Sequence, residues 1–269
     1  MLKTESRNPK TTHIDKMTSL EMVKIINEEN MNSVKAVEKA LPSIAEAIEV
    51  VVDSLNAGGR VFYIGAGTSG RLAVSDAAEC PPTYGVSYDL FNAIVAGGRD
   101  AVFKAQENIE DSAETGRSDL LTYSPTKNDV VIGISASGGA AYVCSALNLG
   151  REVGAATISI SSNGEAKIAK DATVAIWADT GAEVITGSTR MKSGNAQKMI
   201  LNMISTCAMV RTGKVYENLM INLRPTNIKL TARMIGIVRD LTGLDEKASE
   251  KLLDENEWNI RQAVDSFKK

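Results

Sequence analysis

Residue types that bind metals, form disulfide bonds or cross membranes are scarce in this sequence. The 269 residues include one histidine, His13, and three widely spaced cysteines, Cys80, Cys144 and Cys207. Because there is no Cys-x-x-Cys pair and no second histidine, we expect no zinc site, and we predict no metal and no cofactor. No apolar run approaches the ~18 residues of a membrane-spanning helix, and the polar first residues do not resemble a secretory signal. We therefore expect a cytoplasmic protein.

A large excess of one charge sign is also missing. The formal net charge is −3 and the isoelectric point is about 5.5, so no electrostatic attraction to nucleic acid or to an anionic membrane is expected. Hydrophobic residues make up 43% of the chain and charged residues 23%, which is ordinary for a globular protein long enough to bury a sizeable core. We predict neither a nucleic-acid partner nor a membrane partner.

The sequence does contain a regular alternation of two patterns. Short, almost continuously apolar runs predict strands covered on both faces, and the segments between them have helical patterns. This favours an α/β fold with a doubly wound, mainly parallel five-stranded sheet and right-handed crossovers. The predicted strands are Val61–Ile64, Phe91–Val95, Val130–Ile134, Ala155–Ile160 and Val174–Trp177. The predicted helices between them are Arg71–Glu79, Arg99–Leu121, Ala140–Leu149 and Glu165–Lys170.

Helical segments flank the predicted sheet on both sides. Two amphipathic helices are expected before it, with a break near Leu41-Pro42, and a methionine-rich helix that serves packing is expected after it. Three short helices are expected at the C-terminus. The flanking helices are Ser19–Asn27, Val34–Leu55, Arg190–Arg211, Lys229–Thr242, Glu246–Leu253 and Asn259–Phe267. The predicted domains are an N-terminal helical segment (1–56), a sheet domain (57–225) and a C-terminal helical bundle (226–269).

A glycine-rich turn follows the first predicted strand. Gly65-Ala-Gly-Thr-Ser-Gly70 presents backbone N–H groups where a helix is expected to begin, and Thr68 and Ser69 add hydroxyl donors. Such a turn binds anions, phosphate above all. A dinucleotide site lacks the acidic residue expected about 20 residues later, and a P-loop lacks its Gly-Lys-Ser/Thr. The turn therefore favours a phosphosugar over a nucleotide.

The same segment contains a candidate acid. Pro81 and Pro82 predict that the helix stops near Cys80, which leaves Glu79 in the last turn, where the helix dipole disfavours a negative charge. A carboxyl group in that position is suited to hold its proton and act as an acid. Cys80 is a possible nucleophile, but a catalytic thiol needs a base, and His13 lies in a polar N-terminal segment. We interpret Cys80 as a packed small residue.

A second turn of the same kind, Ser135-Ala-Ser-Gly-Gly139, follows the third predicted strand. Ligands of doubly wound sheets bind at the carboxyl ends of strands, near the point where the strand order reverses. We therefore expect the two turns to hold one ligand together. Serine before a helix also serves as an N-cap, and for any single serine the two interpretations have equal weight.

One segment closely resembles a family signature: the run from Gly65 through Glu79-Cys-Pro-Pro-Thr-Tyr-Gly85 is similar to that of bacterial N-acetylmuramic acid 6-phosphate etherases, which have the sugar isomerase (SIS) fold. The resemblance covers most of the chain. Other segments similar to the family are residues 14–27, 181–198, 218–220 and 226–230. The chain departs from the family at Gly139, Ala140 and Ala141, where the family usually has Arg-Thr-Pro.

The resemblance implies a cytoplasmic homodimer that cleaves the lactyl ether of N-acetylmuramic acid 6-phosphate by elimination and water addition. It implies that Glu79 is the acid and Glu110 the base, although in sequence alone Glu110 would be a solvated charge on an acidic helix face. It also implies a phosphate site in the two turns. That site comprises Gly67, Thr68, Ser69, Ser135, Ser137 and Gly138. The C-terminal helices resemble ubiquitin-associated-like bundles, which we interpret as packing and dimer support.

Two other classes of function stay open. A phosphosugar isomerase of the same fold is disfavoured, since many of these use an imidazole and this chain has only His13. A non-catalytic sugar-phosphate sensor, similar to the glucokinase regulatory proteins, is favoured by the missing Arg-Thr-Pro at Gly139–Ala141 and disfavoured by the pair Glu79 and Glu110. A DNA-binding regulator would need a basic helix-turn-helix before the sheet, and residues 1–56 lack that charge balance.

Overall fold

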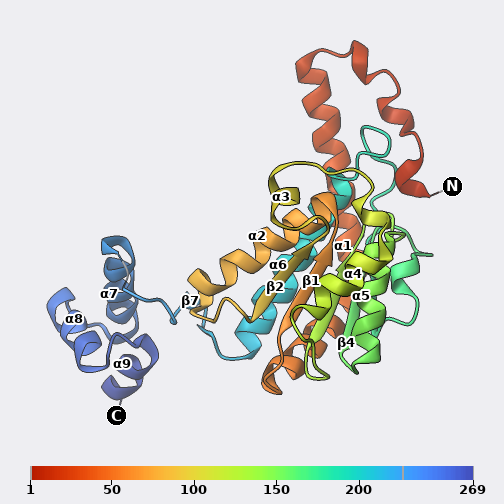
Figure 1. The fold of residues 1–269 in the computed structure, drawn as a ribbon. Helices are drawn as coiled ribbons and strands as arrows, with labels where there is room; N and C mark the ends of the chain where they lie inside the picture. The colour runs from red at the N-terminus through yellow and green to blue at the C-terminus, as the bar shows by residue number, and fades with distance from the viewer. Residues whose placement is uncertain (1, 226, 269) are drawn as a thin grey trace. The chain divides into compact units, whose positions relative to one another are not determined.

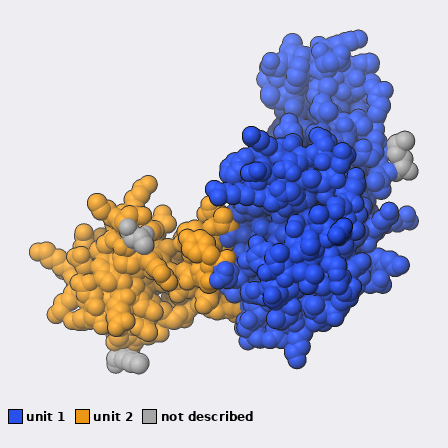
Figure 2. Space-filling view, in the orientation of Figure 1, with its two compact units in different colours: residues 1–77, 89–208 blue, residues 78–88, 209–269 orange. Residues whose placement is uncertain are grey.

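The structure is a computed structural model that describes residues 2–225 and 227–268. The chain divides into two compact units, residues 1–77 with 89–208 and residues 78–88 with 209–269 (Figure 2). The predicted start of the C-terminal bundle, Thr226, lies outside the described residues, and the division into three segments stays a prediction. No helix within the described residues is long and apolar enough to cross a membrane.

The first unit is built on a five-stranded sheet in the order β2-β1-β3-β4-β5, with all strands parallel (Figure 1). The predicted α/β fold with a parallel sheet is therefore confirmed. Valine- and isoleucine-rich runs form the strands, as expected for a sheet covered on both faces. The strands are β1 (Val61–Gly65), β2 (Phe91–Val95), β3 (Val130–Ile134), β4 (Ala156–Ser161) and β5 (Val174–Trp177). The strand order reverses between β1 and β3, which makes this pair the topological switch point.

Helices pack against the side chains that the strands present, in alternation, on the two faces of the sheet. On one face, α4 (Ala113–Leu121) and α5 (Ala141–Glu152) lie side by side (Figure 1). Their apolar side chains form a core with Phe62 and Ile64 of β1. Because neighbouring strand residues point to opposite faces, Tyr63 points the other way, and its hydroxyl donates a hydrogen bond of 3.1 Å to Asp76 of the next helix.

The helix before the sheet is continuous, so the predicted break near Leu41-Pro42 is wrong. Helix α1 spans Ser19–Asn56 and has a capping box in which Thr18 and Glu21 bond each other's backbone N–H groups. Pro42 removes one hydrogen bond from this long helix. Buried residues of α1, among them Ala40, Ile44 and Val52, pack the helix against the sheet. This packing outweighs the loss of the hydrogen bond.

The helix after the first glycine-rich turn also differs from its prediction. Helix α2 spans Gly67–Tyr84; it begins earlier than expected and continues through Pro81 and Pro82. Glu79 is therefore not in the last turn, and the helix-dipole argument for a protonated carboxyl group does not apply to it. The helix ends where Gly85, with φ +66°, donates to the carbonyl of Pro81. Cys80 is 2% exposed, which fits the interpretation as a packed residue.

The single helix predicted over Arg99–Leu121 is wrong as well. Three elements replace it: α3 (Gly98–Phe103), the 3-10 turn η4 (Ile109–Asp111) and α4. Asn108 has φ +61°, which turns the chain out of helical geometry, and the Ser112 hydroxyl caps α4 by accepting from Thr115 N–H at 3.3 Å. Glu110 consequently lies on a tight turn rather than on a helix face. The helix predicted over Glu165–Lys170 is only the 3-10 turn η5 (Lys167–Ala169).

The predicted helices after the sheet are present. Helix α6 spans Lys192–Arg211, and in it Ile200, Leu201 and Ile204 are fully buried. The second unit contains α7 (Ile228–Thr242), α8 (Glu246–Glu255) and α9 (Ile260–Phe267) with the hairpin β6 (Val215–Tyr216) and β7 (Leu219–Met220). Asn227, Asp245 and Asn259 cap the three helices through their side chains. Their apolar faces share one small core that includes Met234, Val238, Leu253 and Ile260.

Candidate active site

The switch point of the sheet brings the two predicted turns together. In the parallel register β1 pairs with β3 so that Gly65 lies opposite Ile134. The turn that follows Gly65 and the turn that follows Ile134 therefore lie side by side at the carboxyl ends of β1 and β3. This is the position at which doubly wound folds bind their ligands.

A cavity of about 240 Å³ lies at this edge, within the first unit. Most of the predicted site residues line it. They are Gly67, Thr68, Ser69, Ser135, Ser137 and Glu110. A larger cavity of about 740 Å³ lies beside the edge strand β2, but it contains none of the predicted site residues and its lining includes apolar side chains such as Val74 and Ile94. We assign the site to the smaller cavity because the anion-binding turns converge there.

The first turn brings backbone N–H groups to the cavity. Helix α2 begins at Gly67, so the first amides of the helix have no intrahelical acceptors. Close packing of turn and helix requires glycine: a Cβ on Gly65 would lie 2.7 Å from the nitrogen of Gly70, and one on Gly70 would lie 2.8 Å from the oxygen of Gly65. Gly67 has φ +54° and open space where a Cβ would be. The result is a helix N-terminus with a place for an anion.

Ser69 is held by a buried glutamine of α6. Its hydroxyl donates to Gln197 Oε1 at 3.0 Å, and Gln197 Nε2 has no hydrogen-bond partner among the described residues although the side chain is only 2% exposed. A half-turn of this amide lets Nε2 donate to Ser69 Oγ and leaves the hydroxyl hydrogen for a ligand. Gln197 can therefore accept a hydrogen bond from the Ser69 hydroxyl or donate one to it.

The second turn is stabilised by its own serines. Ser135 Oγ accepts from the N–H of Gly138 at 3.1 Å, and Ser137 Oγ accepts from the N–H of Gly139 at 3.3 Å. These serines do not cap α5, because its N-cap is Ala140, which has no side-chain cap. The two hydroxyls also bond each other at 3.4 Å, so one of them donates to the other and the second keeps its hydrogen for the cavity.

Gly138 supports the turn from outside the cavity. It does not line the cavity, its φ is +73°, and a Cβ there would lie 2.2 Å from the Cβ of Ala166. Only glycine fits that position without a shift of the backbone. Its role is to shape the second turn.

Two carboxyl groups line the cavity. Glu110 comes from η4 and Glu5 from the 3-10 turn η1 (Lys3–Glu5), and both side chains are exposed. No lysine or arginine is among the lining residues. An anion in this cavity is therefore held by N–H and O–H donors and by the helix N-terminus.

Besides Gly138, two residues that the sequence analysis considered, Glu79 and His13, lie outside the cavity. Glu79 is exposed and does not line it; it is on α2, ten residues after Ser69. His13 is exposed in the N-terminal segment and does not line it either. Among the residues that the structure describes, no group of three or more His, Cys, Asp and Glu side chains is placed to hold a metal ion.

The sequence interpretation missed part of the lining. Gly187 and Thr189 belong to the segment 181–198 that resembles a family signature, but no site role was assigned within it. Glu5 had no signal at all, because a single glutamate near a chain end is ordinary. Only the fold shows that Glu5 meets residues about 180 positions later, with its Oε2 3.1 Å from the point where a Gly187 Cβ would be.

Comparisons of domain families agree with the fold. Residues 43–151 match the glucokinase regulatory protein N-terminal SIS domain, residues 114–206 match the SIS domain, and residues 233–269 match the TAP C-terminal domain. Solved structures with this architecture include the phosphoheptose isomerases of Neisseria gonorrhoeae and Francisella tularensis, each with a TM-score of 0.53 and 19% identity. These matches cover 71% and 73% of this chain and 98% and 99% of the isomerases. They show the fold alone.

Sequence relatives match over nearly the whole chain. The N-acetylmuramic acid 6-phosphate etherase of Clostridium beijerinckii is 49% identical over 263 residues, which cover 98% of this chain and 86% of the relative. The etherase of Clostridium botulinum strain Loch Maree is 50% identical, with coverage of 98% and 87%. That of Serratia proteamaculans is 46% identical, with coverage of 98% and 89%.

Proposed function

The chain belongs to the family of N-acetylmuramic acid 6-phosphate etherases, and from this membership we propose how its cavity carries out the reaction. The protein is a carbon–oxygen lyase that cleaves the D-lactyl ether of its substrate and gives N-acetylglucosamine 6-phosphate and D-lactate. The reaction belongs to the recycling of cell-wall amino sugars. Because the substrate is a phosphorylated sugar, we place the enzyme in the cytoplasm.

The reaction needs one base and one acid. An unactivated ether resists hydrolysis, but the open-chain aldehyde of the sugar acidifies the proton on the adjacent carbon. A base removes that proton, the electron pair forms a carbon–carbon double bond, and the lactate oxygen leaves with a proton from the acid. Water then adds across the unsaturated aldehyde. Two carboxyl groups in opposite protonation states suffice for these steps.

The phosphate end of the substrate is assigned to the two turns. The start of α2, with Thr68 and Ser69, and the second turn, with Ser135 and Ser137, line one cavity at the switch point of the sheet. Convergence of these donors on one small cavity, together with Glu110, is the observation that carries the proposal. A glycosidase would also use two carboxylates, but it would not need paired phosphate turns.

Glu110 is our candidate base, and Glu79 our candidate acid. Glu110 lines the cavity beside the turns. Glu79 is exposed and does not line the cavity. The proposed site is therefore completed by a second protomer, which contributes Glu79 or receives Glu110. Glu79→Gln should lower D-lactate release by about two to four orders of magnitude and leave phosphosugar binding largely intact.

A homodimer is supported by one side of α1. Five large apolar side chains of this helix are exposed, and at 100° per residue they fall within about 80° of arc. These residues and their exposed fractions are Leu20 62%, Val23 58%, Met31 51%, Val34 48% and Leu41 46%. Sedimentation equilibrium at micromolar concentration should report twice the chain mass of 28.7 kDa. Val34→Lys, which places a charge in this stripe, should weaken the dimer and with it the activity; a fully active monomer would overturn the shared site.

The function is tested with the purified protein and N-acetylmuramic acid 6-phosphate, by an enzymatic assay for D-lactate. The unphosphorylated sugar is the control and should be a very poor substrate, because the two turns then have no anion to bind. Tight binding without lactate would instead indicate a sugar-phosphate sensor. Interconversion of aldose and ketose phosphates would indicate an isomerase, which the cavity disfavours since no histidine lines it.

A further inference from the structure

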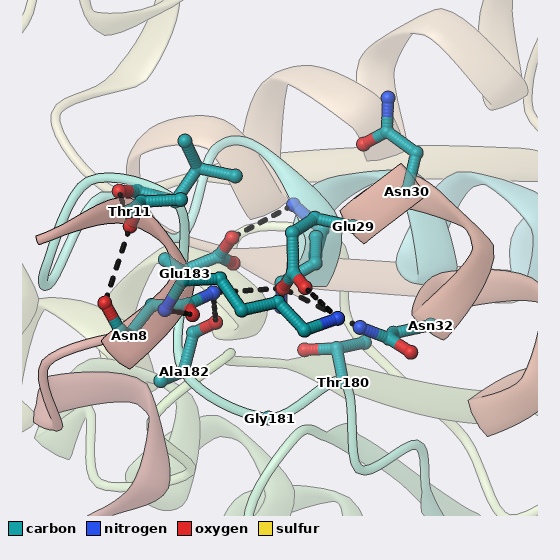
Figure 3. A network of polar contacts seen from close by, with 12 residues as sticks. Asn8, Thr11, Glu29, Asn30, Asn32, Thr180, Gly181, Ala182 and Glu183 are labelled. Carbon is teal, nitrogen blue, oxygen red and sulfur yellow. Dashed lines mark hydrogen bonds and ion pairs between the residues drawn. The ribbon is translucent and has the colours of Figure 1, made fainter. Parts of the chain in front are cut away.

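One residue near the start of the chain, Glu5, lines the cavity, and its neighbours bond to other parts of the first unit. Residues 3–11, which we call the N-terminal arm, contain η1 and the 3-10 turn η2 (Pro9–Thr11). Figure 3 shows Asn8 and Thr11 of the arm against α1 and the loop 180–184. The Asn8 amide donates to Glu29 Oε2 at 2.7 Å and to the carbonyl of Ala182 at 3.3 Å. The Thr11 hydroxyl donates to the carbonyl of Val184 at 2.8 Å.

Buried charges hold the arm in place. Glu29 is 3% exposed and pairs with Lys192, which is 1% exposed, at 2.6 Å, and with Lys10 of the arm at 3.2 Å. Glu183 is fully buried and accepts from the N–H groups of Lys192 and Ser193 at the start of α6. The arm adds Lys10 and the Asn8 amide to the partners of the buried Glu29 carboxylate, and these contacts favour one position of the arm.

The arm is also joined to the second turn. Thr4 is fully buried, and its hydroxyl oxygen accepts from Asn163 Nδ2 at 3.3 Å. The same amide donates to the carbonyls of Ala136 and Ser137 at 3.1 and 3.2 Å. One buried amide therefore fixes Thr4 relative to the turn that we assign to the phosphate. The next residue, Glu5, is placed at the cavity by this contact.

The contacts of the Glu5 carboxylate do not indicate a structural role. Among the described residues, it has no hydrogen bond and no ion pair, whereas Lys3 pairs with Asp179 and Asn8 with Glu29. A carboxylate fixed at a cavity and without a protein donor is available to accept from a ligand. The ligand donors of matching chemistry are hydroxyl groups.

We propose that Glu5 is a specificity-determining residue that accepts a hydrogen bond from a sugar hydroxyl and so orients the phosphosugar in the cavity. This proposal rests on the proposed function for the identity of the ligand. Electrostatics fixes the direction: Glu5 and Glu110 both repel a phosphate dianion, so the phosphate lies at the two turns and the sugar lies toward the carboxylates. The arm thereby contributes the recognition of the part of the ligand that the turns do not touch.

The test compares the affinities for two probes, N-acetylglucosamine 6-phosphate and inorganic phosphate, by calorimetry on the full chain. Glu5→Ala should weaken binding of the phosphosugar about tenfold or more, because it removes a hydrogen bond to a charged group. Binding of inorganic phosphate should be unchanged or slightly tighter. Glu5→Gln, which keeps an acceptor oxygen but no charge, should lie between wild type and Glu5→Ala.

Two control variants separate recognition from folding. Asp15→Asn removes an exposed carboxylate of the N-terminal segment that does not line the cavity, and it should change neither affinity. Lys3→Ala removes the ion pair with Asp179 and reports what loosening the arm does to both probes. If Glu5→Ala weakens binding of both probes equally, or of neither, the proposal is wrong.

The outcome is independent of the lactate assay. If wild type releases no D-lactate but the selective loss of phosphosugar affinity is found, the proposed function fails and the role of Glu5 stands. If lactate is released and Glu5→Ala binds the phosphosugar as wild type does, the function stands and the role of Glu5 fails.

Discussion

Two polar regions of the first unit use their polar groups in opposite ways. In the buried anchor around Glu29, each carboxylate has partners within the protein: Glu29 has Lys10, Lys192 and Asn8, and Glu183 has two backbone N–H groups. In the cavity at the switch point, the carboxylates of Glu5 and Glu110 have no hydrogen bond and no ion pair with the described residues. Polar groups that satisfy one another hold the fold, and polar groups left facing a cavity are available to a ligand.

The difference predicts which measurement each region controls. Substitutions in the anchor should lower the free energy of unfolding, because they leave a buried charge without its partner. Substitutions of the cavity carboxylates should change turnover or affinity and leave stability nearly unchanged. A residue that moved both quantities strongly would break this division.

The largest effect is expected for Glu110. If it removes the proton next to the aldehyde, Glu110→Gln should lower the turnover number by about two to four orders of magnitude, with the melting temperature of wild type. The measurement is the rate of D-lactate release beside a thermal melt. Glu107→Gln, a change of the same kind on a nearby exposed carboxylate outside the cavity, is the matched control and should keep wild-type turnover. Full activity in Glu110→Gln would remove Glu110 from the mechanism.

The next effect concerns the anchor. Glu29→Ala should lower the free energy of unfolding by about 3–5 kcal/mol, because Lys192 is then a buried and unpaired cation. Lys192→Met should cost less, since Glu29 keeps Lys10 at 3.2 Å and Asn8 at 2.7 Å, and methionine fills a similar volume. Urea unfolding of both variants gives the comparison. Equal costs would show that Lys10 does not compensate.

A smaller effect is expected in the first turn. Ser69→Ala should raise the Michaelis constant by about tenfold or more, because it removes a hydrogen bond to a charged phosphate, and it should leave the turnover number nearly unchanged. Gln197→Glu should act in the same direction: a carboxylate at that position only accepts from Ser69 and so occupies its hydroxyl hydrogen. Initial rates at several substrate concentrations separate the two constants. A fall in turnover alone would place Ser69 at the reacting atoms.

The sequence was sufficient for the scaffold and insufficient for the wall of the site. Five apolar runs predicted all five strands of the parallel sheet, because a sheet covered on both faces leaves a local pattern, whereas the short hairpin strands β6 and β7 were not predicted. The two turns could be found because each is one short segment after a strand. The helix ends predicted from Pro42, Pro81 and Pro82 were wrong, because tertiary packing and not local preference sets where α1 and α2 end.

Glu5 could not be predicted because its position depends on distant contacts. Thr4 meets Asn163, and Glu5 meets Gly187; no local pattern carries pairs so far apart in the chain. Glu110 illustrates a milder form of the same problem. Its acidic neighbourhood has a helical pattern, and the turn at Asn108 that directs Glu110 to the cavity has no strong signal.

The smallest predicted effect is a pH dependence that belongs to the anchor and not to the cavity. Burial by itself raises the pKa of Glu29, but hydrogen bonds from Lys192, Asn8 and Lys10 outweigh it and hold the pKa below its ordinary value of 4.5. A carboxyl group with a lowered pKa in the folded state contributes stability that is fully present above pH 4.5 and is lost as the pH falls through the folded-state pKa. Burial raises the pKa of Asp129, but hydrogen bonds with Arg60 and Thr126 outweigh it and lower this pKa. Asp129 therefore adds a loss of stability in the same pH direction, and wild type alone cannot isolate Glu29.

The measurement is therefore the difference in free energy of unfolding between wild type and Glu29→Gln, in urea, at several pH values from 7 to 3. This difference should be constant above pH 4.5 and shrink below it, since only wild type then takes up the extra proton. A difference that stays constant down to pH 3 would mean that packing, and not charge, makes Glu29 important to the anchor.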